Sequence, residues 1–192
     1  MSSDPTEAAK SPATNIPAVI KVAIIEDQRD IREGLAWIIR ATEGFDCTGA
    51  FRSVEEAVEK IGFDLPHVVL TDIGLPGMSG VEGIRILKER HPKLLLLMLT
   101  VYEDDEMIFD ALCAGACGYL LKKTSPTRLI ESLREAMGGG APMSPEVASR
   151  VIKLLIGAEP AEGDQIERRQ SQGEAYAVRP FDLKPTADWA LR

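Results

Sequence analysis

The feature that most constrains this chain is a strict alternation of two hydrophobic periodicities between residues 19 and 137. Short apolar runs typical of buried strands alternate with stretches whose apolar residues recur at the spacing of an amphipathic helix. The predicted strands are residues 19–25, 45–51, 67–71, 94–100 and 118–121. The predicted helices are residues 28–41, a segment opened by a Ser53/Glu56 capping box, a segment opened by Ser79, and residues 103–113 and 126–137. Five such units predict an α/β fold, a doubly wound five-stranded parallel sheet with helices on both faces.

The segments outside this alternation differ from it in composition. Residues 1–18 are rich in Ser, Pro, Ala and Thr, which predicts a disordered lead-in. A run of three glycines ends the α/β domain, which we place at residues 19–140. Residues 141–157 carry apolar residues at helical spacing and predict an extra C-terminal linker helix. Residues 158–192 have little periodicity and predict a flexible tail, too small for a core of its own.

Composition argues against several classes of protein. The chain has 30 acidic and 22 basic residues and a net charge of −8, so direct DNA binding by this chain is not expected. Three cysteines are too few for a disulfide framework and favour a reducing, cytoplasmic compartment. The longest apolar run, residues 94–99, is far shorter than the ~20 residues of a membrane-spanning helix, so no membrane span is expected.

Five polar side chains stand where the predicted strands end. Glu26 and Asp27 follow the first strand, and Asp72 follows the third. Thr100 ends the fourth strand, and Lys122 follows the fifth. Ligands of doubly wound sheets bind beyond the carboxyl ends of the strands, so we expect these five side chains to converge there.

Three converging carboxylates would repel one another. At a separation of about 5 Å and an effective dielectric constant of about 20, each like-charge pair costs roughly 3 kcal/mol. Lys122 offsets part of this cost, and a divalent cation would offset more. Oxygen ligands without His or Cys favour Mg²⁺ over zinc. A carboxylate in such a site can act as a nucleophile toward a phosphoryl group, whose charge Lys122 and Thr100 would stabilise.

With these residues in place, the chain resembles the receiver domains of two-component response regulators of the NarL/FixJ (LuxR-type) subfamily. The resemblance covers about residues 19–137 and rests on five segments. They are IIED (24–27), LTDIGLPGMSGVEGIRIL (70–87), LMLTVYEDD (97–105), AGACGYLLKKTSP (114–126) and LIESLREA (129–136). The resemblance implies a flavodoxin-like (βα)5 fold and a role in phosphorelay signalling. It also implies a sensor histidine kinase as phosphodonor, and a chain that is not a dedicated enzyme.

The resemblance also implies a metal site and a phosphoacceptor. Asp72 matches the aspartate that receives the phosphoryl group. Glu26, Asp27, Asp72 and the backbone carbonyl of Gly74 match the ligands of Mg²⁺. Glu26 departs from the family pattern, in which a shorter Asp is commoner at this position.

A switch and an output surface follow from the same resemblance. Thr100 and Lys122 match the pair that contacts the phosphoryl group, and Tyr119 matches the aromatic residue that turns inward on activation. Tyr119 could also be a fixed core residue. The implied surface for a partner or a homodimer comprises residues 103–113, 118–121 and 126–137. In this subfamily a LuxR-type helix-turn-helix domain normally follows, and residues 180–192 weakly resemble its opening, so no complete output domain is expected within this sequence.

Three alternatives stay open. A Mg²⁺-dependent phosphatase with an aspartyl nucleophile would need a second acid two residues after Asp72, where Gly74 stands. A flavin binder on the same fold would need a Ser/Thr/Gly-rich loop after the first strand, where EDQRD (26–30) stands. A phosphate-independent interaction module would have kept only the fold, and the intact acid set speaks against it.

Overall fold

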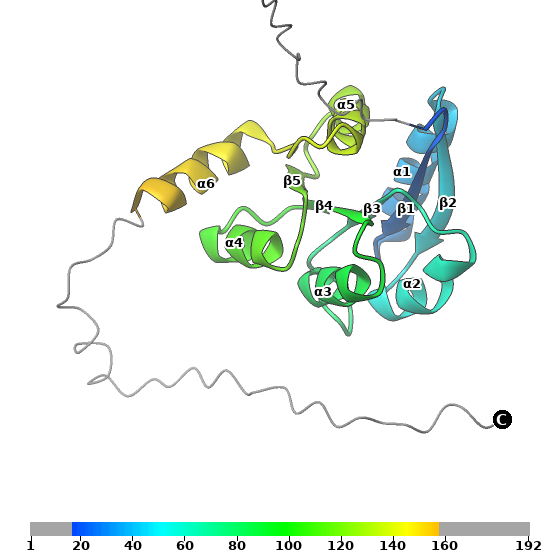
Figure 1. Ribbon diagram of the computed structural model, residues 1–192, viewed down its shortest axis with the longest axis horizontal. Helices are drawn as coiled ribbons and strands as arrows, with labels where there is room; N and C mark the ends of the chain where they lie inside the picture. Colours follow the sequence, from blue (N-terminus) through cyan, green and yellow to red (C-terminus); the bar gives the residue numbers. More distant parts are fainter. Residues whose placement is uncertain (1–16, 158–192) are drawn as a thin grey trace, which may run out of the picture. The chain divides into compact units, whose positions relative to one another are not determined.

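The computed structural model describes residues 17–157 (Figure 1). Most of the predicted lead-in and all of the predicted tail, residues 1–16 and 158–192, lie outside the described residues. The strands are β1 (Ile20–Ile25), β2 (Phe45–Phe51), β3 (Val68–Thr71), β4 (Leu95–Thr100) and β5 (Gly118–Leu121). The helices are α1 (Arg29–Ala41), α2 (Val54–Lys60), α3 (Gly80–Arg90), α4 (Asp105–Cys113), α5 (Pro126–Met137) and α6 (Pro145–Gly157), with a short 3-10 helix at Ile61–Phe63.

The five strands form one parallel sheet in the order β2-β1-β3-β4-β5. This confirms the predicted doubly wound α/β fold. Among the helices of residues 17–157, none combines the length and the apolar character needed to cross a membrane.

Apolar layers cover both faces of the sheet. Alternate residues of β1 point to opposite faces, so Ala23 and Ile25 join one layer while Val22 and Ile24 join the other. Helices α2, α3 and α4 pack on the first face, and α1 and α5 pack on the second. This double covering explains why β4, in which residues 96–100 are all buried, reads as an unbroken apolar run in the sequence.

Serine residues begin three of the helices. The side chains of Ser53, Ser79 and Ser125 accept hydrogen bonds from backbone N–H groups at the starts of α2, α3 and α5. The capping box predicted at Ser53 forms only in part. The Ser53 hydroxyl accepts from the Glu56 N–H as predicted, but the Glu56 carboxylate accepts from the N–H of Arg52 rather than from that of Ser53. The complete box forms at Ser79 with Glu82.

The segment between α5 and α6 lies against the edge of β5. The N–H of Tyr119 donates to the Pro142 carbonyl at 2.9 Å, and the N–H of Ser144 donates to the Tyr119 carbonyl at 3.1 Å. The Ser144 hydroxyl accepts from the N–H of Leu121 at 3.0 Å. Helix α6 then buries Val147 completely in the same apolar layer as α4. The sequence predicted the helix, and this attachment to β5 is an additional finding.

Candidate functional site

Three carboxylates from two neighbouring strands meet at the carboxyl end of the sheet. Glu26 and Asp27 directly follow β1, and Asp72 directly follows β3, which pairs with β1 in parallel. One carboxylate oxygen from each residue lies within 4.8 Å of the other two. Glu26 and Asp72 are buried, whereas Asp27 is exposed. The structure therefore brings together the acids that the sequence predicted to converge, in a site that is open at Asp27.

Neighbouring residues contact both the backbone and the side chain of Asp72. Its N–H donates to the Ile25 carbonyl at 3.1 Å, and its Oδ1 accepts from the N–H of Ile73 at 2.7 Å. Gly80 passes so close that a Cβ there would lie 1.8 Å from the Asp72 carbonyl oxygen. The loop can take this path only with glycine at position 80, a requirement that was not expected from the sequence.

Lys122 bridges two of the carboxylates. Its Nζ lies 2.7 Å from Glu26 Oε2 and 2.8 Å from Asp72 Oδ2, and its side chain is only 10% exposed. Burial alone would lower the pKa of Lys122, but the hydrogen bonds and charges of Asp72 and Glu26 outweigh it, so its pKa is raised. The ammonium group therefore stays charged at neutral pH and supplies one positive charge to the acid cluster.

One ammonium group does not fully compensate the cluster. Burial raises the pKa of Glu26, and the hydrogen bond and charge of Lys122 offset only part of that effect. Among the described residues, Lys122 is the only cation that forms ion pairs with these carboxylates, so three carboxylates against one ammonium group leave the site short of positive charge. Oxygen donors alone, with an open side at Asp27 where water can complete the coordination, fit a hard divalent cation such as Mg²⁺.

Thr100 ends β4 beside this cluster and is completely buried. Its carbonyl accepts from the N–H of Lys122 at 2.9 Å, so the two residues are joined through their backbones. Its hydroxyl lies 3.5 Å from the N–H of Tyr102. The ring of Tyr102 lies against Gly74, where a Cβ would come within 3.1 Å of it. Tyr102 was not among the residues expected from the sequence, in which its only signal is an aromatic residue two positions after Thr100.

Tyr119 lies inside the protein in this conformation. Its side chain is completely buried, and its hydroxyl donates to the Tyr102 carbonyl at 2.8 Å. Burial, reinforced by the nearby negative charges, raises its pKa. The inward position matches the one that the family resemblance assigns to the active state, and the same burial suits a fixed core residue. Rotation of Tyr119 stays a prediction.

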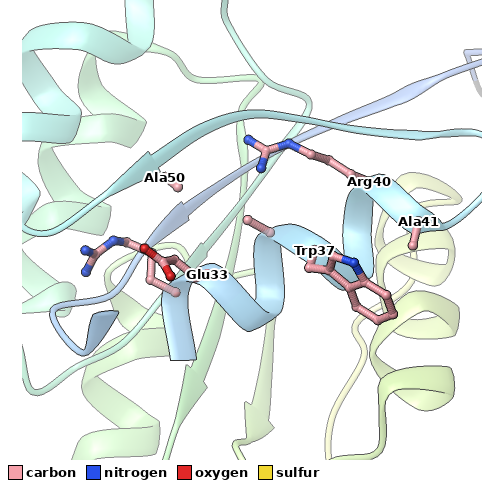
Figure 2. A pocket seen from close by; sticks show the side chains of 7 residues that line it. Glu33, Trp37, Arg40, Ala41 and Ala50 are labelled. Atoms are coloured by element: carbon pink, nitrogen blue, oxygen red, sulfur yellow. The ribbon is translucent and has the colours of Figure 1, made fainter. Parts of the chain in front are cut away.

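A separate groove of about 720 Å³ lies along α1 and the edge strand β2 (Figure 2). Trp37 and Arg40 of α1 and Ala50 of β2 are among its lining residues. None of the three clustered carboxylates lines the groove. Arg32 is the lining residue that also contacts the loop of the acid cluster.

Residues 22–134 match the family model of the response regulator receiver domain. The chain belongs to this family. This receiver resembles the transcriptional regulatory protein LnrK of Bacillus subtilis, with 36% identity over 134 residues, 70% of this chain and 61% of the relative. It also resembles the DNA-binding transcriptional activator DevR/DosR of Mycobacterium tuberculosis, with 32% identity over 140 residues, 73% of this chain and 64% of the relative. The chain thus spans less than two thirds of the length of either relative.

Solved structures of response regulators share the fold of this receiver. A LuxR-family response regulator from Aurantimonas superposes with a TM-score of 0.68 at 24% identity, covering 72% of this chain and 99% of that one. The isolated receiver domain of RcsB from Salmonella enterica serovar Typhimurium superposes with a TM-score of 0.64 at 22% identity, covering 69% of this chain and 98% of that one. The predicted family and receiver fold are confirmed, and the names of the curated relatives describe them as transcriptional regulators.

Proposed function

We propose that this receiver accepts a phosphoryl group on Asp72 from a sensor histidine kinase in a Mg²⁺-dependent reaction. The observation that carries the proposal is the cluster of Glu26, Asp27 and Asp72 bridged by the Lys122 ammonium. A nucleophile, a set of hard oxygen ligands and a fixed cation lie within one small volume. Phosphoryl transfer depends mainly on such positioning and electrostatic stabilisation.

The metal ion would be held by the carboxylates of Glu26, Asp27 and Asp72 and by the backbone carbonyl of Gly74. When bound, Mg²⁺ supplies positive charge that offsets the repulsion among the carboxylates and stabilises the phosphoryl oxygens. The exposed position of Asp27 supports this assignment, because Mg²⁺ usually keeps several water ligands.

The residues of the chain prepare Asp72 for attack. The Ile73 N–H holds one carboxylate oxygen and Lys122 holds the other, so the plane of the carboxylate is fixed before the phosphoryl group arrives. A bond forms between an Asp72 oxygen and phosphorus, and the bond from phosphorus to the kinase's histidine nitrogen breaks. The imidazole leaves and takes up a proton from solvent. Lys122 and the Thr100 hydroxyl then donate to phosphoryl oxygens.

The phosphorylated site would act on the rest of the domain through Thr100 and Tyr119. Movement of Thr100 toward the phosphoryl group changes the contact with Tyr102, whose carbonyl holds the Tyr119 hydroxyl. The surface of residues 103–113, 118–121 and 126–137 changes with it and presents a site for a partner or a second copy. Phosphorylation can shift this equilibrium only by its differential free energy in the two states.

The wider role that we propose is transcriptional regulation in the cytoplasm. The names of the relatives support it, since LnrK and DevR/DosR are both transcriptional regulators. RcsB, a structural neighbour, forms dimers on DNA. In this proposal the described receiver provides the switch, and contact with DNA is left to another part of the assembly.

Intact-mass spectrometry after incubation with acetyl phosphate tests the proposal. The wild-type chain is expected to gain one phosphoryl group with Mg²⁺ and none with a chelator, and Asp72→Asn is expected to gain none. Repetition with beryllofluoride should change the oligomeric state or the partner binding of the wild type alone. Wild-type chain that gains no adduct and behaves like Asp72→Asn would instead support a phosphate-independent module. Steady multiple turnover of phosphate monoesters would support a phosphatase.

A further inference from the structure

The β1–α1 loop carries two of the three clustered carboxylates but lacks the usual anchor of a helix start. Helices α2, α3 and α5 begin with serine side chains that cap them. Gln28, at the corresponding position before α1, makes no side-chain capping bond. The loop is held at Glu26, whose N–H donates to the Phe51 carbonyl at 3.0 Å, and the N–H of Gln28 donates to Glu26 Oε1 at 3.3 Å. Neither of these bonds holds the carbonyl groups on the two sides of the Asp27 α-carbon.

Arg32 provides this anchor from the first turn of α1. Its Nη1 donates to the Glu26 carbonyl at 2.6 Å and to the Asp27 carbonyl at 2.9 Å. These two carbonyls belong to the peptide groups on either side of the Asp27 α-carbon. Holding both peptide groups fixes the direction of the Asp27 side chain, although that side chain is itself exposed.

We propose that Arg32 is a positioning residue that orients Glu26 and Asp27 for binding of the divalent cation. Mg²⁺ requires near-octahedral geometry with short bonds, so its affinity depends strongly on the placement of its ligands. Residues that orient metal ligands typically contribute about 10–100-fold to metal affinity. The proposal rests on the metal site of the proposed function and adds a residue to it.

Positioning and simple electrostatics predict opposite effects. A guanidinium group next to a cation site repels the cation, so its charge alone would weaken metal binding. If charge dominated, removal of Arg32 would make Mg²⁺ bind more tightly. If positioning dominates, its removal loosens the loop and makes Mg²⁺ bind more weakly.

Calorimetric titration with Mg²⁺ of the full chain and of three variants distinguishes these effects. Arg32→Met is expected to raise the Kd for Mg²⁺ about 10-fold. Arg32→Lys, which keeps the charge and one donor, is expected to give an intermediate Kd. Arg40→Met is the matched control, because Arg40 lies on the same helix and lines the same groove but contacts the Cys47 carbonyl. Its Kd is expected to stay within about twofold of the wild-type value, as for a residue that orients no metal ligand.

Amide hydrogen exchange in the metal-free protein provides a second readout. Exchange at Asp27 and Gln28 is expected to be faster in both Arg32 variants than in the wild type, and Mg²⁺ is expected to slow it again. Excess Mg²⁺ should also restore labelling by acetyl phosphate in Arg32→Met. Unchanged or tighter Mg²⁺ binding in both Arg32 variants would overturn the proposal. Absence of Mg²⁺ binding by the wild type would instead overturn the metal site and, with it, the role of Arg32.

Discussion

The acid cluster and the β5 edge occupy the same sheet but are built from different parts of the chain. Charged side chains make the acid cluster, where Lys122 bridges Glu26 and Asp72. Backbone groups of residues 142–144 make most of the β5 edge, and the Ser144 hydroxyl completes it. Like charges are crowded in the acid cluster, which lowers stability there, whereas the hydrogen bonds of the β5 edge contribute stability.

The two regions are nevertheless neighbours. The Leu121 N–H is bonded to Ser144, and the next residue is Lys122. Tyr119 pairs with residues 142–144 through its backbone and reaches Tyr102 through its hydroxyl. Substitutions in the two regions should therefore affect stability and metal binding differently. The expected change in stability is largest for Lys122→Met and smallest for Glu26→Gln.

Lys122→Met should give the largest loss of stability. Removal of the ammonium leaves the buried carboxylates of Glu26 and Asp72 without a cationic partner, which typically costs about 3–5 kcal/mol. The pKa of Glu26 is already raised, and it would rise further without Lys122. A carboxyl group whose pKa is raised in the folded state destabilises the fold as the pH rises above the pKa that the group has in the unfolded chain. The loss of stability relative to the wild type should therefore grow from about pH 5 to pH 8.

Urea unfolding of Lys122→Met at both pH values, with and without Mg²⁺, measures this effect. Added Mg²⁺ should recover much of the lost stability, because it binds only the folded state. A deficit that is independent of both pH and Mg²⁺ would contradict the electrostatic account of the cluster.

Val147→Ala should destabilise the β5 edge without affecting metal binding. Val147 is completely buried, and loss of two methyl groups from a core costs about 2 kcal/mol, including the cavity term. The Kd for Mg²⁺ should stay unchanged. Ile152→Ala is the matched control, because Ile152 lies on the same helix and is 55% exposed. Equal losses in the two variants, measured by urea unfolding, would show that α6 does not pack as described.

Ser144→Ala should have a smaller effect in the same region. It removes the acceptor of the buried Leu121 N–H, and the loss of one such hydrogen bond costs about 1 kcal/mol. Amide exchange at Leu121 should accelerate, whereas Ser149→Ala, at an exposed position of α6, should leave it unchanged. Unaltered exchange in Ser144→Ala would mean that the hydroxyl does not hold β5.

Glu26→Gln should produce the smallest change, in the opposite direction. Burial disfavours the charged form of Glu26, so a neutral amide should raise the melting temperature of the metal-free protein by a few degrees at neutral pH. The gain should vanish toward the ordinary pKa of glutamate, about 4.3, where the wild-type side chain is neutral as well. Differential scanning calorimetry measures it, and a lower melting temperature at neutral pH would contradict the conclusion that burial dominates at Glu26.

The sequence predicted the architecture because the spacing of apolar residues follows which side chains of a strand or a helix are buried. The bounds of β2 and β5 agree with prediction to the residue. Helix α4 begins two residues later than predicted, since Asp104 keeps an extended backbone and takes the N-cap position. The convergence of the acids followed from parallel topology, which places the ends of neighbouring strands at one edge.

The features that the sequence did not reveal depend on backbone groups or on close approach. Arg32 donates to two backbone carbonyl oxygens. Because every residue has a backbone carbonyl, no pattern of residue types predicts this contact. Gly80 is required by the nearby Asp72 carbonyl, which lies eight positions away in the chain. The attachment of residues 142–144 to β5 is also a backbone pairing, and composition carries no signal for it.

Replacement of Mg²⁺ by paramagnetic Mn²⁺, a cation with similar oxygen ligands, tests the central claim most directly. The broadening of backbone amide signals in a nuclear magnetic resonance titration locates the bound ion. We expect saturable broadening centred on Glu26, Asp27, Asp72 and Gly74, which excess Mg²⁺ reverses. Broadening that does not saturate, or that spreads over exposed acids such as Asp105 and Glu131, would show that the crowded carboxylates do not form a metal site.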